Sequence, residues 1–331
     1  MMKKLMTGLL AALMILSLAA CGGSSAPSST EPAPAPAPSS DAPSAPASSD
    51  APSSQPETEG PAVGVEMPTY PDAATVDLAA VEAEIKELAP KVKTVTDGKL
   101  VLGTSADYAP YEFHIMKDGV DTIVGFDVAL AQAIADELGV ELEIHDIPFD
   151  NILMEISTGA VDVGIAGFTP TPERLAAVDM SHLYELQSQS LLIRKADLDK
   201  YKTIEDFGAG TTVGAQTSSV QEELALEKTP DAAHTSLQMI PALVMDLKGQ
   251  KVDAVVMETA VAEGYVKAQD DLAILCEVPY DSNGKAVVVK KGNEDLLNFV
   301  NAVVTKVVCN GDMQKFIDEA NAISDQEITA G

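Results

Sequence analysis

Arg174 is one of only two arginines in the chain, and it follows two Thr-Pro pairs in the segment FTPTPERLAAVDMS, residues 168–181. A guanidinium in the first turn of a helix, directly after a buried strand, can bind a carboxylate through two parallel hydrogen bonds. The Gly167 amide and the Thr169 hydroxyl come just before it and can donate to the same oxygens. These three residues predict a carboxylate-binding site, with an ion pair between Arg174 and a nearby acid as the alternative.

A second group of polar residues has the types needed to complete such a site. In VGAQTSSVQEEL, residues 213–224, Ser218 and Ser219 begin a predicted helix, where an anion is favoured. Glu258 follows the apolar run VDAVVM and could receive an ammonium group. Taken singly, the serines are ordinary helix caps, and an acid is common at the start of a helix. Together, a carboxylate clamp and a lone acid predict a receptor for a zwitterion.

Two aromatic residues, Tyr108 in TSADYAPYEF and Phe149 in IPFD, follow the first two predicted strands of the folded part. The chain has 7 tyrosines, 7 phenylalanines and no tryptophan, so rings at two strand ends stand out. Core packing is their ordinary role. We expect both rings at the same sheet edge, where they could enclose a ligand side chain.

Sequence signatures of catalysis, cofactor binding and metal binding are missing. The chain has no GxSxG, HExxH, P-loop or paired-cysteine pattern, and GAGTTVG, residues 208–214, lacks the glycine spacing of a dinucleotide loop. We therefore expect no enzyme activity, no cofactor and no metal. Cys276 and Cys309 lie in apolar contexts and are expected to be buried free thiols, with one disulfide between them as the alternative.

The N-terminal residues 1–20 have the pattern of a secretion signal, since MMKK is basic and the apolar run after it breaks at small residues. The ending Leu-Ala-Ala-Cys21 resembles the lipobox of bacterial lipoproteins, which implies that Cys21 carries the lipid. A membrane-spanning helix is the alternative, but it needs roughly 20 apolar residues. Residues 21–70 are rich in Ser, Ala and Pro and are expected to form a disordered tether, with a mucin-like stalk as the alternative.

The charge of the chain limits its partners. A formal net charge of -30 argues against nucleic acid, because binding to phosphates needs clustered lysine and arginine. We expect the protein to be a monomer. We also expect its lipid alone to anchor it to the extracytoplasmic face of the cell membrane.

From residue 97 onward, short apolar runs alternate with amphipathic stretches. This order predicts an α/β fold in which mainly parallel sheets are flanked by helices. The arrangement occurs twice, because Asp162 and Asp253 each follow a similar helical segment at the same spacing. Before this part, residues 71–96 have one apolar face and predict a helix docked on the domain, with a short coiled coil as the alternative.

The repeat predicts two lobes. We expect lobe 1 to comprise 97–190 and 285–331, and lobe 2 to comprise 195–280. The apolar runs SLLIRK, residues 190–195, and KAVVVKK, residues 285–291, would lead out of the first lobe and back into it. Two such crossings form a two-strand hinge with a cleft between the lobes.

Five segments, taken in order, resemble the extracellular polar amino-acid-binding proteins of ABC uptake transporters. They are GTSADYAPYEF, IVGFDVALAQAIADELG, GFTPTPERLAAVDMS, VGAQTSS and VDAVVME. The resemblance covers residues 97–331. It implies a two-lobed periplasmic-binding-protein-like fold of type II, which closes on a free L-amino acid and delivers it to an ABC transporter permease.

The resemblance also assigns roles to individual residues. The family's carboxylate-binding arginine falls on Arg174, its supporting hydroxyl on Thr169, its second-lobe hydroxyl on Ser219, its ammonium-binding acid on Glu258, and its stacking aromatics on Tyr108 and Phe149. Glu258 is longer than the aspartate often found there. Ser105 stands where members that bind arginine, lysine or histidine often carry an acid, so the resemblance favours a polar amino acid, with a cationic one as the alternative.

Two other functions remain as alternatives. One is a cleft enzyme of the cyclohexadienyl dehydratase type, in which an acid transfers a proton. The other is a ligand-sensing co-receptor. The identity of the amino acid depends on contacts around Ser105, Tyr108, Glu112, Phe149 and Gln216.

Overall fold

The computed structural model describes residues 66–281 and 284–330, and the side chains up to residue 326. The expected secretion signal, Cys21 and residues 21–65 of the expected tether lie outside the described residues. The last part of the tether, residues 66–70, lies against the first lobe, because the Leu183 amide donates a hydrogen bond of 3.0 Å to the Thr69 carbonyl. Among the described residues, no helix combines the length and hydrophobicity that a membrane span needs.

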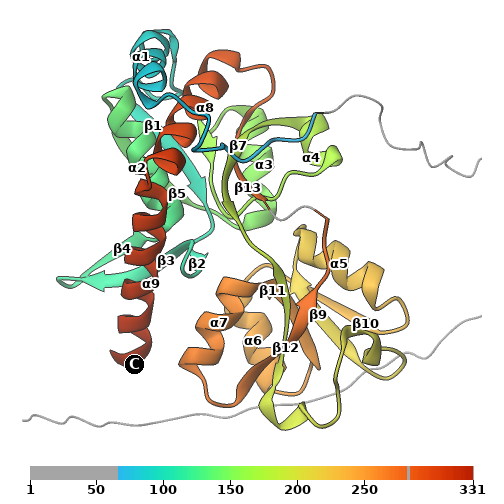
Figure 1. The fold of residues 1–331 in the computed structure, drawn as a ribbon. Helices are drawn as coiled ribbons and strands as arrows, with labels where there is room; N and C mark the ends of the chain where they lie inside the picture. Colours follow the sequence, from blue (N-terminus) through green and yellow to red (C-terminus); the bar gives the residue numbers. More distant parts are fainter. Residues whose placement is uncertain (1–65, 282–283, 331) are drawn as a thin grey trace, which may run out of the picture. The chain divides into compact units, whose positions relative to one another are not determined.

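The first sheet has five strands in the order β5-β1-β6-β13-β7. Figure 1 labels β5, β1, β13 and β7 of this sheet. Their bounds are Glu141–Asp146 for β5, Lys99–Thr104 for β1, Val163–Gly164 for β6, Gly284–Lys290 for β13 and Val178–Leu186 for β7. The pairs β5-β1 and β1-β6 are parallel, whereas β13 runs antiparallel to both of its neighbours.

The second sheet repeats this pattern in the order β10-β9-β11-β8-β12. Its strands are Ala233–Leu237 for β10, Thr212–Gln216 for β9, Ala254–Glu258 for β11, Gln189–Arg194 for β8 and Leu272–Val278 for β12. Again the first three strands are parallel and the fourth is antiparallel to both neighbours. The α/β architecture that the sequence predicts is confirmed, with antiparallel strands added at the same side of both sheets.

Asp162 and Asp253, the aspartates of the repeat, make equivalent hydrogen bonds in the two lobes. Asp162 accepts a 2.8 Å hydrogen bond from the Val101 amide of β1, and its own amide donates to the Val101 carbonyl at 2.9 Å. Asp253 makes the matching pair with Thr212 of β9, at 2.9 and 2.7 Å. Asp162 thus connects the residue before β6 to β1, and Asp253 connects the residue before β11 to β9.

The chain crosses between the two sheets twice. After β7 it enters the second sheet as β8, and after β12 it returns to the first sheet as β13. The run 190–195 was expected to lead out of the first lobe, but its strand β8 pairs with β11 and β12. The second sheet therefore begins at Gln189, earlier than the expected residue 195.

Helices cover both sheets. Those of the first lobe are α1 (Leu78–Leu88), α2 (Phe126–Leu138), α3 (Phe149–Thr158), α4 (Pro172–Ala177), α8 (Glu294–Cys309) and α9 (Asp312–Ala330). Those of the second lobe are α5 (Val220–Lys228), α6 (Ile240–Lys248) and α7 (Thr259–Ala268). A small antiparallel sheet of β2 (Asp107–Tyr108), β3 (Glu112–Lys117) and β4 (Val120–Val124) precedes α2.

Helix α1 lies where the apolar pattern of residues 71–96 predicts a helix. Asp77 caps it by accepting from the amides of Ala79 and Ala80. Its apolar face buries Ile85 against α8, and no coiled-coil partner is needed to cover that residue.

Cys276 and Cys309 are both free thiols. They are half-buried, so the expectation of full burial is wrong, while the free state agrees with the first of the two alternatives.

Candidate functional site

Arg174 is buried between the two lobes. Helix α4 begins at Pro172, and the Thr171 hydroxyl caps it by accepting from the Arg174 amide at 3.1 Å. The guanidinium donates to the Thr169 carbonyl at 2.9 Å and, across to the second lobe, to the Ser218 carbonyl at 3.0 Å. Pro is favoured at the first position of a helix and Thr at its cap, so the sequence TPTPER itself places this side chain.

No acid whose side chain the structure describes, within residues 66–281 and 284–326, forms an ion pair with Arg174. Its side chain lies instead near two rings, with the guanidinium carbon 5.8 Å from the centre of Phe149 and 5.5 Å from that of Phe168. Burial lowers the pKa of Arg174 from its ordinary value. Glu223 and Glu173 act on this charge from a distance without forming an ion pair, so an anion in direct contact would stabilise the buried guanidinium further.

Gly167 and Thr169 are close to Arg174 but are already engaged. The Gly167 amide donates to Asp127 at 2.8 Å, so in this conformation it does not serve as the predicted ligand donor. Its φ of +58° is in the left-handed region, which favours glycine. The Thr169 hydroxyl accepts a hydrogen bond of 2.8 Å from Lys285.

The two serines of the second lobe act differently from each other. Ser219 caps α5, because its hydroxyl accepts from the Glu222 amide at 3.2 Å and donates to the Gln216 carbonyl at 2.7 Å. Ser218 presents its carbonyl, not its hydroxyl, to Arg174. In this conformation Ser219 therefore has the ordinary structural role of a helix cap.

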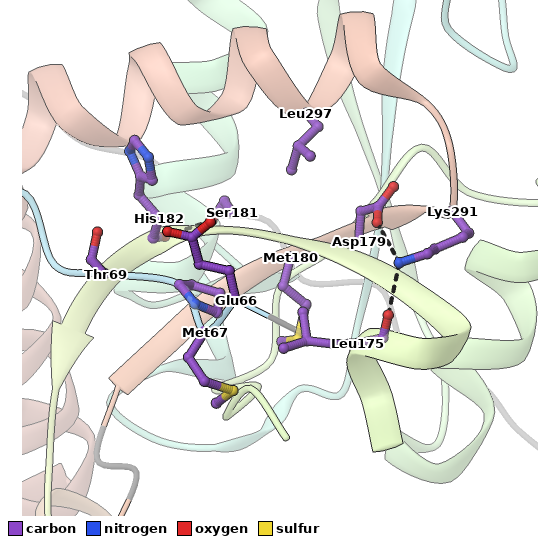
Figure 2. Close-up of a pocket in the computed structure, with 11 residues that line it drawn as sticks. Glu66, Met67, Thr69, Leu175, Asp179, Met180, Ser181, His182, Lys291 and Leu297 are labelled. Atoms are coloured by element: carbon purple, nitrogen blue, oxygen red, sulfur yellow. Dashed lines mark hydrogen bonds and ion pairs between the residues drawn. The ribbon is translucent and has the colours of Figure 1, made fainter. Parts of the chain in front are cut away.

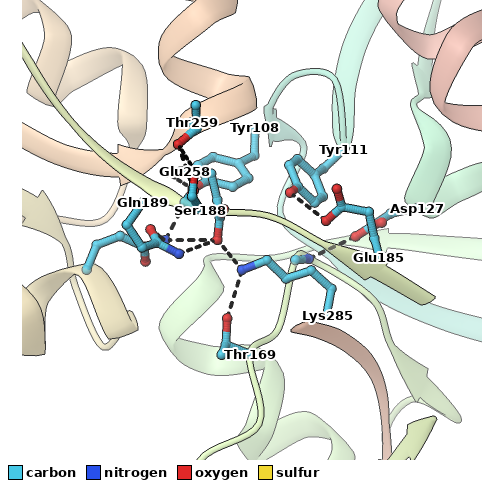
Figure 3. A network of polar contacts seen from close by, with 12 residues as sticks. Tyr108, Tyr111, Asp127, Thr169, Glu185, Ser188, Gln189, Glu258, Thr259 and Lys285 are labelled. Carbon is cyan, nitrogen blue, oxygen red and sulfur yellow. Dashed lines mark hydrogen bonds and ion pairs between the residues drawn. The ribbon is translucent and has the colours of Figure 1, made fainter. Parts of the chain in front are cut away.

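Glu258 ends β11 and is fully buried. Its Oε1 accepts from Gln189 Nε2 at 2.7 Å and forms an ion pair with Lys285 (Figure 3). Its Oε2 has no hydrogen-bond partner among the described residues. An unpaired buried oxygen is costly, so a donor that reaches it would stabilise the site.

Lys285 was missed by the sequence interpretation. It is the second residue of β13, and its side chain is fully buried. Figure 3 shows it reaching from β13 to Glu258 and Thr169. The available signal was a lysine at the head of KAVVVKK, since a charged residue is rarely buried without a partner and this run predicts a buried strand.

The two predicted aromatics are packed against protein groups. The Tyr108 hydroxyl accepts from the Glu258 amide at 3.2 Å, which links β2 of the first lobe to β11 of the second. Phe149 stacks on Phe168, with ring centres 4.7 Å apart and planes at 21°. Tyr108 thus contacts Glu258, and Phe149 lies near Arg174.

Ser105 lies beside these residues in a separate hollow. It is buried and lines a cavity of about 230 Å³ together with Asp107, Asp146 and Gln238. Two direct contacts close this region, because Asp107 accepts from the Ile240 amide at 2.9 Å and Gln238 donates to Asp150 at 3.1 Å.

A group of buried acids lies behind the site. Asp127 accepts from the Tyr184 hydroxyl at 2.9 Å, and Glu185 accepts from Tyr111 at 3.2 Å. Burial raises the pKa of Asp127 to about 6 and that of Glu185 to about 7. Lys285 opposes both shifts by its positive charge.

Glu185→Gln is expected to change how stability depends on pH. The folded state raises the pKa of Glu185 to about 7 from 4.5, so it binds the proton more tightly than the unfolded chain does. The wild type should therefore lose stability as pH rises from about 4.5 to 7. Urea unfolding should show the advantage of the variant growing by about 2 kcal/mol between pH 5.5 and 8. Equal curves for the variant and wild type at both pH values would contradict the assignment.

A cavity of about 550 Å³ lies elsewhere on the first lobe (Figure 2). Residues 66–69, β7 and the start of α8 line it, and Lys291 bonds there to Asp179 and to the Leu175 carbonyl. None of the predicted ligand residues lines this cavity. Among the described residues there is also no cluster of three or more His, Cys, Asp or Glu side chains that could hold a metal.

The model of the bacterial extracellular solute-binding proteins, family 3, matches residues 100–320. The chain belongs to this family. The family resemblance that the sequence motifs carry is thereby confirmed.

Curated relatives of this solute-binding protein bind amino acids. The arginine-binding extracellular protein ArtP of Bacillus subtilis is 36% identical over 221 residues, which cover 66% of this chain and 84% of ArtP. The L-cystine-binding protein TcyJ of Escherichia coli is 28% identical over 217 residues, covering 66% of this chain and 80% of TcyJ.

Solved structures show the same fold. The amino acid ABC transporter substrate-binding protein AbpA of Streptococcus pneumoniae, bound to L-arginine, has a TM-score of 0.67 and 36% identity. The match covers 72% of this solute-binding protein and 98% of AbpA. The ancestral amino acid-binding protein AncCDT-1, a precursor of cyclohexadienyl dehydratase, has a TM-score of 0.62 and 30% identity, covering 71% and 98%. The type II periplasmic-binding-protein fold is therefore confirmed.

Proposed function

We propose that this protein captures a free L-amino acid in the cleft between its lobes and delivers it to an ABC transporter permease. Arg174 binds the α-carboxylate and Glu258 binds the α-ammonium group, while Tyr108 and Phe149 flank the ligand. Thr169 and, in a ligand-bound conformation, Ser219 and the Gly167 amide complete the carboxylate site.

One observation carries this proposal. Among the described residues, Arg174 is a buried cation without an ion-pair partner and Glu258 is a buried carboxylate whose Oε2 has no donor, and both residues are connected to Thr169. Arg174 reaches its carbonyl, and Lys285 joins its hydroxyl to Glu258. A zwitterion would satisfy both unpaired groups at once, which a simple anion or a simple cation would not do.

A ligand screen tests the proposal. The purified protein is freed of bound ligand by unfolding and refolding, and its thermal midpoint is measured with each L-amino acid, its D-enantiomer and its decarboxylated amine. A ligand at about 100 times its Kd should add roughly 2.7 kcal/mol to stability. We expect shifts with one or a few L-amino acids and none with the amines. Unchanged midpoints throughout would refute the amino-acid assignment.

The lipid anchor at Cys21 belongs to the same proposal, because delivery to a permease requires the receptor to stay near the membrane. Stable anchoring by lipid needs more than one acyl chain, as lipoproteins provide. Cys21→Ser should move the protein from the membrane fraction to the medium on immunoblots of fractionated cells. Retention of the variant in the membrane fraction would contradict the anchor.

The enzyme alternative is testable in the same preparation. It is favoured by the buried Glu258–Lys285 pair, which could move a proton, and by the likeness to a precursor of cyclohexadienyl dehydratase. Product formation from prephenate or arogenate, lost in Glu258→Gln, would support it. Ligand-induced stabilisation without turnover would support the receptor.

A further inference from the structure

Two direct contacts join the lobes at the end of the cleft that lies opposite the hinge. The hinge strands β7 and β13 are at one end of the first sheet, and β8 and β12 are at one end of the second sheet. Strands β5 and β1 lie at the other end of the first sheet, as β10 does in the second. The segments that follow these three strands carry the two contacts. A rotation about the hinge moves the groups farthest from it the most, so both contacts must break when the lobes open.

The first contact gives a helix of one lobe a partner from the other lobe. The first amides of a helix have no acceptor within the helix itself. At the start of α6, Met239 has no side-chain oxygen that could accept from them, and Pro241 has no amide. The Ile240 amide donates instead to Asp107, on β2 of the first lobe, at 2.9 Å. The start of α6 therefore has this acceptor only while the lobes are closed.

The second contact joins the same segment of the second lobe to helix α3. Gln238 directly follows β10, and its side-chain amide donates to Asp150 at 3.1 Å. Gln216, at the end of β9, donates to the Gln238 carbonyl at 3.0 Å and so holds this segment against the second sheet. The residues before α6 are thus fixed to their own lobe and bonded to two aspartates of the other lobe.

We propose that Asp107, Asp150, Gln238 and the start of α6 form a clasp that holds the lobes closed over the ligand and slows its release. The inference rests on the proposed function, since the clasp acts on a ligand in the same cleft. None of these residues is assigned to the α-carboxylate or the α-ammonium group. Asp107 is the main positioning residue of the clasp, because its bond is partly buried whereas the bond between Gln238 and Asp150 is exposed.

The rate of ligand release measures the clasp. The ligand-free protein is loaded with radiolabelled L-arginine or L-glutamine, and then with the other L-amino acids in turn, and koff is followed after excess unlabelled amino acid is added. Asp107→Ala leaves the Ile240 amide without its acceptor and should raise koff at least about fivefold, which corresponds to about 1 kcal/mol. The value of kon, obtained from koff and the calorimetric Kd, should stay within about twofold, because the ligand enters before the clasp forms.

Asp107→Asn separates the hydrogen bond from the charge. Burial raises the pKa of Asp107 to about 6 from 3.8, Asp146 adds to this shift, and the Ile240 amide opposes it. Because opening exposes Asp107, closing takes up a proton, and the Kd of the wild type should fall by up to about fourfold from pH 7.5 to 5.5. The oxygen of the Asn amide can accept the same bond, so this variant should keep koff within about threefold of the wild type and lose that part of the pH dependence.

Other titratable groups near Asp107 are the same in the wild type and in Asp107→Asn, so the difference between the two proteins isolates Asp107. These groups are Tyr108 on β2, Glu112 and His114 on β3, Asp146 on β5 and Tyr265 on α7. The residues of α9 and of the start of α6 that line the cavity beside Asp107 carry no charge; they are Met239, Pro241 and Ser324.

Asp136→Ala is the matched control, because Asp136 is exposed on α2 of the same lobe and bonds to Gln132 of its own helix. It should match the wild type in koff and in pH dependence. If the wild type binds an amino acid but Asp107→Ala raises koff less than about fivefold, or Asp107→Asn keeps the full pH dependence, the clasp is refuted and the proposed function stands. If the wild type binds no L-amino acid, the proposed function fails and the clasp fails with it.

Discussion

Arg174→Ala is expected to raise the Kd for the amino acid by at least about 100-fold, because removing one partner of a buried charge pair costs about 2–5 kcal/mol or more. Arg174 has no ion-pair partner among the side chains described within residues 66–281 and 284–326, so the ligand carboxylate would be its counter-charge. Its guanidinium donates hydrogen bonds to the Thr169 carbonyl of the first lobe and to the Ser218 carbonyl of the second lobe, so it lies between the two lobes. Calorimetry on the refolded, ligand-free variant measures the effect.

Arg194→Ala is the contrasting variant, since it removes the other arginine. Arg194 pairs with Asp197 and Asp253 and donates to the Leu247 and Val252 carbonyls, all in the second lobe. Its loss should lower the thermal midpoint and leave the Kd of the folded protein within a few-fold of the wild type. Near-native affinity in Arg174→Ala would mean that the carboxylate binds elsewhere.

Glu258→Gln is expected to weaken both ligand binding and the fold. The amide cannot balance a ligand ammonium group, and it leaves Lys285 buried without its counter-charge. Removing one partner of a buried ion pair typically costs about 3–5 kcal/mol. We expect a loss of that size in urea unfolding and a Kd raised at least about 100-fold.

Glu263→Gln provides the control for this change, because Glu263 is exposed on the neighbouring helix α7. It should match the wild type in both measurements. If Glu258→Gln kept wild-type stability and affinity, neither the ion pair nor the ammonium site would have the importance assigned to it.

The sequence predicted well those features that depend on local patterns. Alternating apolar runs predicted the strands, and the repeated Val-Asp pairs predicted a duplicated lobe whose aspartates make equivalent backbone bonds. TPTPER predicted a helix that begins just before Arg174, because Thr and Pro have defined positions at a helix start.

Features that depend on long-range contacts were not predictable in this way. The Gly167 amide is bound by Asp127, which lies 40 residues earlier in the chain. Lys285 reaches Thr169 across 116 residues, and no local pattern specifies that pairing. Ser219 was assigned to the ligand from a resemblance, while its hydrogen bonds follow the stronger local preference of serine to cap a helix.

The exchange of strands between the sheets has a consequence for the order of folding. The second sheet takes all five of its strands from one continuous stretch, residues 189–278. The first sheet needs β13, which follows that whole stretch, to join β6 to β7. Because the chain is synthesised from its N-terminus to its C-terminus, the second lobe can complete its sheet before the first lobe does. Until β13 arrives, the first lobe keeps open strand edges at β6 and β7, and such edges are where a growing chain is most exposed to mispairing.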